Sequence, residues 1–114
     1  MKLQSFKNMP IDYKSNGCGS DKARFDFIPD TIYGISIFES CRRHDWAYMV
    51  GGDINDFNKA NMEFLSNMLI QIDEGIVWWK PTFLARRRAM SYYEGVARFG
   101  LESFNLTEVE AINV

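Results

Sequence analysis

The tripeptide Gly51-Gly52-Asp53 separates two stretches with helical periodicity, and it constrains the fold more than any other feature. Glycine readily ends a helix, and aspartate is favoured at a helix start. We expect a first helix to begin near Ser36, because Ser36 and Glu39 have the spacing of a capping box, and to end at the glycines. A second helix is expected from Asp53 to about Asp73. Two helices joined by so short a turn predict a helical hairpin.

The inner face of the second expected helix carries two asparagines among apolar residues. The residues that recur there at three- and four-residue steps are Ile54, Phe57, Asn58, Asn61, Phe64, Leu65, Met68 and Ile72. Buried amides need hydrogen-bond partners. We therefore expect polar groups to face Asn58 and Asn61.

A third helix and a long N-terminal segment complete the expected fold. Pro81 suits the first turn of a helix that reaches Phe99, and Gly100 can end it. Turn-forming residues dominate positions 15–21 and predict a long structured loop before the helices. At 114 residues the chain fits one domain. The prediction is a single all-α domain, with an N-terminal segment and loop at 1–36, a helical part at 37–105 and a tail at 106–114.

Composition narrows the classes of function and location. The formal net charge of −2 argues against broad nucleic-acid binding, which needs a basic excess. No apolar run approaches the roughly 20 residues that span a bilayer. The first residues also lack the apolar stretch of a secretory signal. We expect a protein that is either cytoplasmic or secreted or delivered by a route that the sequence does not reveal.

One face of the first expected helix gathers chemically reactive side chains. Cys41, His44, Asp45 and Tyr48 follow steps of three, one and three residues, so they share that face. His44 is the single histidine of the chain and suits a general base near neutral pH. The carboxylate of Asp45 is a hard oxygen ligand of the kind that calcium prefers. The alternative is a polar patch with an ordinary surface His-Asp pair.

Three motifs in this chain resemble those of the phospholipase A2 superfamily. The stretch 40–48, with the pattern Cys-x-x-His-Asp-x-x-Tyr, resembles the active-site helix. The turn Asn16-Gly17-Cys18-Gly19 resembles the calcium loop, and residues 59–65 resemble the following helix. The resemblance covers about residues 16 to 69, with the motifs in the family's order. It is strongest to the small bacterial, fungal and phage-associated members.

The resemblance implies an ester hydrolase that degrades lipid. It implies calcium-dependent hydrolysis of the sn-2 ester of glycerophospholipids at a membrane surface or micelle, with water activated by His44. Tyr48 and the residue at position 61 would orient the histidine. Calcium would be bound by Asp45, the side chain of Asn16 and the carbonyls of Gly17 and Gly19, with Gly19 also at the oxyanion. A disulfide between Cys18 and Cys41 is implied in the same way; two reduced thiols are the alternative.

Asn61 is the main departure from the family pattern, which has aspartate there. An amide can hold an imidazole, but it cannot offset imidazolium charge and can favour the wrong tautomer. Asp56 and Glu63 point to other sides of the helix and cannot replace it. The loop also lacks the family's second glycine pair, and Asn16 stands where related bacterial enzymes have aspartate. The alternative function is therefore a catalytically impaired lipid- or protein-binding module.

Two further features have competing interpretations. Cys41 and His44 with Cys18 and Asp45 could supply four zinc ligands instead of a calcium site. Aromatic and basic residues later in the chain could form a patch that meets lipid headgroups. The alternative is one packed tryptophan and a solvated basic helix face. The residues of this expected patch are Trp78, Trp79, Arg86, Arg87 and Arg88.

Overall fold

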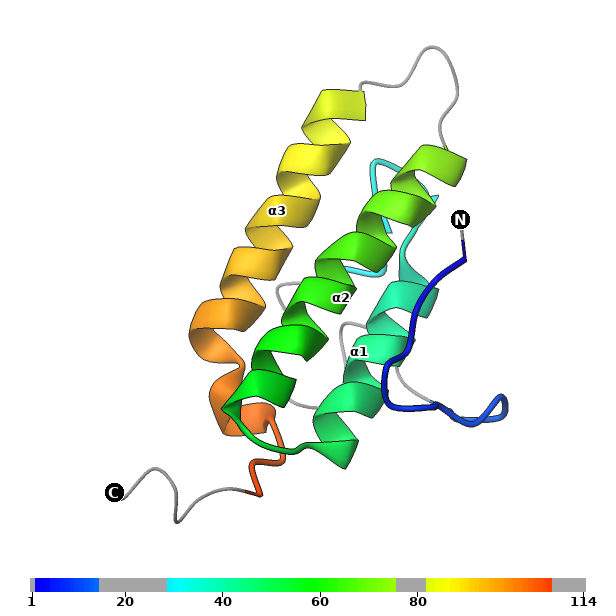
Figure 1. Cartoon of the computed structure of the whole chain (residues 1–114). Coiled ribbons are helices and arrows are strands. Elements are labelled where there is room, and N and C mark those ends of the chain that lie inside the picture. The colour runs from blue at the N-terminus through cyan, green and yellow to red at the C-terminus, as the bar shows by residue number, and fades with distance from the viewer. Residues whose placement is uncertain (1, 15–28, 76–81, 108–114) are drawn as a thin grey trace.

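The computed structural model describes residues 2–14, 29–75 and 82–107, and these are predominantly helical. The helices lie side by side with α2 between α1 and α3 (Figure 1). This confirms the predicted helical hairpin with a third helix. The expected calcium loop, Asn16 to Gly19, lies outside the described residues and stays a prediction. The helices are α1 (Phe38–Val50), α2 (Ile54–Glu74), α3 (Thr82–Phe99) and the 3-10 helix η2 (Leu101–Ser103).

A small β-hairpin precedes α1, so the all-α prediction is incomplete. Strand β1 (Thr31–Ile32) pairs antiparallel with β2 (Ile35–Ser36). The two residues between them, Tyr33 and Gly34, have φ values of 50° and 81°, as a two-residue hairpin turn requires. Strands of two residues are too short to show an alternating pattern in the sequence. Ser36 therefore belongs to a strand and not to a helix cap.

The two hairpin helices begin differently. At α1 the predicted capping box is wrong: Glu39 pairs with Arg42 and Arg43 through contacts of 2.8 and 2.9 Å. At α2 the predicted N-cap is confirmed. The Asp53 carboxylate accepts from the backbone N–H of Asp56 at 2.9 Å, and the Asp56 carboxylate accepts from that of Asp53 at 3.1 Å. This reciprocal pair satisfies two backbone donors that the first turn leaves open.

The turn between α1 and α2 needs its two glycines. Gly51 and Gly52 have φ values of 74° and 140°, which other residues rarely adopt. A Cβ at Gly51 would overlap the carbonyl of Asn105. The backbone N–H of Gly52 donates to that carbonyl at 3.1 Å, and Thr107 donates back to Gly52 at 2.9 Å. The segment after α3 therefore holds the helical hairpin closed.

The buried core joins all three helices to the β-hairpin, with Phe64, Met68 and Ile72 of α2 at its centre. The predicted inner face of α2 is wrong at Ile54 and Asn58, which are exposed, and it omitted Asn67, which is fully buried. Within the described residues, no helix combines the length and the apolar character needed to cross a bilayer.

Candidate functional site

His44, Tyr48 and Asn61 meet between α1 and α2, and all three are buried. His44 and Tyr48 are four residues apart on α1 and therefore share a face. The His44 Nε2 lies 2.9 Å from the Asn61 Oδ1, and the Tyr48 hydroxyl donates to the same oxygen at 2.7 Å. The polar partner expected for Asn61 is thus a pair of residues from the neighbouring helix.

The shared oxygen of Asn61 determines the tautomer of His44. Because the Tyr48 hydroxyl donates to Asn61 Oδ1, this amide oxygen and not the NH₂ group faces the imidazole. Nε2 then carries the proton, and Nδ1 carries the lone pair. The concern that an amide would favour the wrong tautomer does not hold in this arrangement. What Asn61 lacks, compared with an aspartate, is negative charge.

Aromatic rings enclose the imidazole. The His44 ring stacks on Phe64 with centroids 4.4 Å apart, and it lies 4.2 Å from the ring of Tyr48. Burial lowers the pKa of His44 to about 4, opposed by the hydrogen bond to Asn61 and the charge of Asp45. The imidazole is therefore neutral at neutral pH and able to accept a proton, although it is a weak base.

Burial of neutral His44 predicts a specific pH dependence of stability. The unfolded chain takes up this proton near pH 6.5, whereas the folded chain does so only near pH 4. The free energy of unfolding should therefore fall by about 3 kcal/mol between pH 7 and pH 4 on account of this group. Urea denaturation at both pH values measures the change, and His44→Gln should flatten it by that amount. An unchanged pH slope in His44→Gln would contradict the buried neutral state.

The other end of the Asn61 amide is unsatisfied. Within the described residues, the buried Nδ2 has no hydrogen-bond partner. An orphaned buried donor costs roughly 1–3 kcal/mol. Asn61 therefore uses its oxygen twice and its NH₂ group not at all, a pattern that a carboxylate would fit better.

Asp45 borders the same helix face and is held by a residue that sequence reasoning missed. Its Oδ2 accepts a hydrogen bond of 2.5 Å from the hydroxyl of Tyr13. Arg42 donates to the carbonyl of Tyr13 at 2.7 Å, and the Tyr13 ring packs edge-on against Trp46. Burial and the bond to Asp45 raise the pKa of Tyr13, so the phenol remains a donor. Tyr13 lies far from Asp45 in sequence and in no periodic pattern, so no sequence signal indicated it.

The expected calcium ligands are only partly described. Among residues 2–14, 29–75 and 82–107, no group of three or more His, Cys, Asp or Glu side chains could hold a metal. Asp45 is described, whereas Asn16, Gly17 and Gly19 lie outside the described residues. One carboxylate supplies too few oxygens for calcium, so a calcium site at Asp45 would need further oxygen ligands.

Cys41 is buried and disulfide-bonded. The sequence contains one other cysteine, Cys18, which lies outside the described residues, so the pairing of the two stays a prediction. Zinc needs a thiolate and not a disulfide sulfur. The bonded state of Cys41 therefore argues against the zinc alternative.

Gly100 is a second site residue that sequence reasoning missed, because it was assigned only to the end of α3. It is buried, and a Cβ there would overlap the Tyr48 hydroxyl. The absence of a side chain at Gly100 leaves the space in which this hydroxyl reaches Asn61.

A methyl group at Gly100 should therefore disturb the Tyr48–Asn61 hydrogen bond. We expect Gly100→Ala to lower the free energy of unfolding by about 1–3 kcal/mol, as overpacking does. Thermal unfolding measures this, with Gly95→Ala as the control, because alanine within the same helix should raise helix propensity. Equal stability of Gly100→Ala and wild type would show that Tyr48 does not need this space.

The expected interfacial residues are not brought together in the described part of the chain. Trp78 and Trp79 lie outside the described residues. Arg86 pairs with Asp73 at 2.6 Å, and Arg88 lies over the ring of Tyr33, 5.6 Å from its centroid. Arg87 is exposed. A surface depression of about 350 Å³ is lined by Gly34, Ile35, Ser36, Gln71, Glu74 and Gly75 and by none of the expected interfacial residues.

The chain matches no protein-family model, no curated protein and no solved structure. The functional argument therefore rests on the geometry around His44 and on the motifs of the sequence.

Proposed function

We propose that this protein is a calcium-dependent hydrolase of the sn-2 ester of glycerophospholipids, with the chemistry of the phospholipase A2 superfamily. One observation carries the proposal: His44 Nε2 and the Tyr48 hydroxyl both bind the Asn61 oxygen. This arrangement orients a neutral imidazole whose Nδ1 can accept a proton. Asp45, the next residue on α1, offers a carboxylate beside it.

In the proposed reaction, Nδ1 of His44 takes a proton from water as the water oxygen bonds to the ester carbonyl carbon. The bond between that carbon and the sn-2 oxygen then breaks, and the proton returns from His44 to the departing oxygen. Asn61 and Tyr48 hold the imidazole throughout. Calcium, when bound, supplies the Lewis acid that stabilises the carbonyl oxygen as it becomes negative. The products are a fatty acid and a lysophospholipid.

A phospholipid with different acyl chains at sn-1 and sn-2 tests the proposed reaction. In the presence of calcium, mass spectrometry should find only the sn-2 fatty acid and the matching lysophospholipid. Release of both fatty acids in equal amounts would contradict the assigned bond, and release of neither would contradict the proposed enzyme.

Tyr13 is expected to support calcium binding through Asp45. The Tyr13 hydroxyl holds Asp45 Oδ2, and the other carboxylate oxygen would serve as the metal ligand. Loss of such a supporting hydrogen bond typically weakens metal binding by about 10- to 100-fold. Tyr13→Phe should therefore lower calcium affinity by about tenfold in calorimetry. Tighter calcium binding by Tyr13→Phe would instead mean that the phenol blocks the metal.

A binding module that has lost catalysis is the second candidate. It is favoured by the uncharged amide of Asn61 and by the pKa of about 4 for His44, which makes the imidazole a weak base. This alternative expects phospholipid vesicles to bind wild type and His44→Ala equally well, with no release of fatty acid by either.

A further inference from the structure

Residues 3–5 run alongside α1 and α2 and lead into a turn at Phe6 and Lys7, where the backbone N–H of Asn8 donates to the carbonyl of Ser5 at 3.2 Å. Asn67 of α2 holds the middle of this stretch with both ends of its amide. Its Oδ1 accepts from the backbone N–H of Gln4 at 2.8 Å, and its Nδ2 donates to the carbonyl of Gln4 at 3.0 Å. Asn67 is fully buried, so it engages the main chain of Gln4 as a neighbouring β-strand would.

Further hydrogen bonds join this segment to both helices. On the α2 side, the carboxylate of Glu63 accepts from the backbone N–H of Phe6 at 2.8 Å. On the α1 side, the Trp46 indole donates to the carbonyl of Lys7 at 2.9 Å. The main chain therefore binds α2 through Gln4 and Phe6, and it binds α1 through Lys7.

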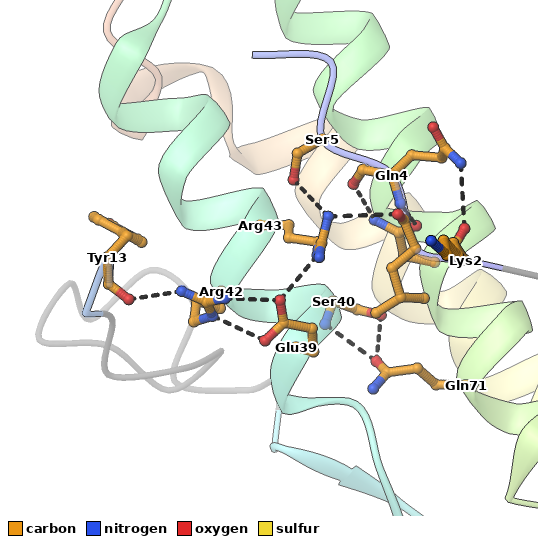
Figure 2. A network of polar contacts seen from close by, with 11 residues as sticks. Lys2, Gln4, Ser5, Tyr13, Glu39, Ser40, Arg42, Arg43 and Gln71 are labelled. Atoms are coloured by element: carbon orange, nitrogen blue, oxygen red, sulfur yellow. Dashed lines mark hydrogen bonds and ion pairs between the residues drawn. The ribbon is translucent and has the colours of Figure 1, made fainter. Parts of the chain in front are cut away.

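Arg43 of α1 adds two contacts on the α1 side. Its guanidinium donates to the carbonyl of Leu3 at 3.4 Å and to the Ser5 hydroxyl at 3.0 Å. Figure 2 shows Arg43 between Ser5 and Glu39, whose carboxylate it also contacts at 2.9 Å. The ion pair with Glu39 fixes the guanidinium in position for the peptide.

Residues 3–7 are attached to the helices by polar contacts and lie outside the buried apolar core. Among the described residues, the buried core cluster contains no member of residues 2–14. Phe6 is 37% exposed and Ile11 is 95% exposed. Segments with few buried apolar contacts open at a lower free energy than the core. Residues 2–14 should therefore detach while the three helices stay folded.

We propose that the surface formed by Arg43 and Trp46 of α1 with Glu63 and Asn67 of α2 is a binding site for a peptide main chain, occupied here by residues 3–7 of the same chain. Its second occupant is the same segment of another copy. Two acidic side chains of the helices favour the sequence of this segment. Asp56 lies 3.5 Å from the ammonium of Lys7, and Asp45 accepts a hydrogen bond from the hydroxyl of Tyr13. The ligand is thus a peptide that turns after its first bonded residues and carries a lysine and, six residues later, a tyrosine.

A fluorescent peptide with the sequence of residues 2–14 tests this site on the full-length protein. Gln4→Pro together with Phe6→Pro removes the two backbone donors that bind Asn67 and Glu63, without changing the helix side chains that bind the segment. The double variant should bind the peptide at least about tenfold more tightly than wild type, because its own segment competes less. Lys2→Pro, one position outside the bonded stretch, is the matched control and should behave as wild type.

Two further measurements complete the test. Asn67→Leu, added to the double variant, should abolish peptide binding, and excess wild-type protein should displace the peptide from the double variant. Equal peptide affinity in wild type and double variant, or binding that survives Asn67→Leu, would overturn the inference. So would loss of the helical circular dichroism signal in the double variant, because the segment would then belong to the cooperative core.

Discussion

Replacing Asn61 with aspartate should raise the rate of ester hydrolysis by about 10²-fold, the scale on which general-base catalysis operates. The amide oxygen already accepts from His44 and Tyr48, so a carboxylate can keep both hydrogen bonds. It adds a negative charge beside the imidazole. That charge should raise the pKa of His44 from about 4 and stabilise the imidazolium that forms when water loses its proton.

The orphaned group of Asn61 supports the same expectation. Within the described residues its Nδ2 has no acceptor, and the substitution replaces this donor with an oxygen. The hydrolysis assay on Asn61→Asp measures kcat/KM, and the acid limb of its pH profile should move upward with the pKa of His44. Asn58→Asp is the control, because it introduces the same charge at an exposed position on α2. An unchanged rate in Asn61→Asp would refute the role given to Asn61.

Removing the carboxylate of Asp45 should abolish calcium binding. The other expected ligands are one amide oxygen and backbone carbonyls, so Asp45 supplies the only full negative charge of the predicted set. Calorimetry should detect binding in wild type and none in Asp45→Ala, and hydrolysis should be lost with it. Asp73→Ala is the control, since Asp73 is an exposed acid that pairs with Arg86. Unchanged calcium affinity in Asp45→Ala would place the metal elsewhere.

Helical periodicity predicted the part of the site that lies on α1 and α2. The spacing of His44 and Tyr48 put them on one face, and the apolar pattern put Asn61 on the inner face of the next helix. Their contact followed from the hairpin that the glycines at 51 and 52 impose. The same reasoning placed Asn58 on the buried face and omitted Asn67. Over the 21 residues of α2, periodicity alone does not fix which residues lie at the edge of the buried face.

Contacts between distant, irregular segments could not be predicted in this way. Tyr13 reaches Asp45 from an irregular segment whose main chain is held by side chains of α1 and α2, and main-chain recognition leaves no sequence pattern. The role of Gly100 depends on where α3 ends relative to the Tyr48 hydroxyl. The β-hairpin was missed because its turn includes Tyr33, a residue that rarely adopts positive φ.

Release of fatty acid from phospholipid micelles, with calcium and with a calcium chelator, tests the proposed hydrolase most directly. Wild type should release the sn-2 fatty acid only with calcium, slowly because Asn61 is uncharged. His44→Ala should release none, although its helical circular dichroism signal is retained. Fatty-acid release that persists in His44→Ala or in chelator would contradict the account, and so would wild-type protein that binds calcium and releases nothing.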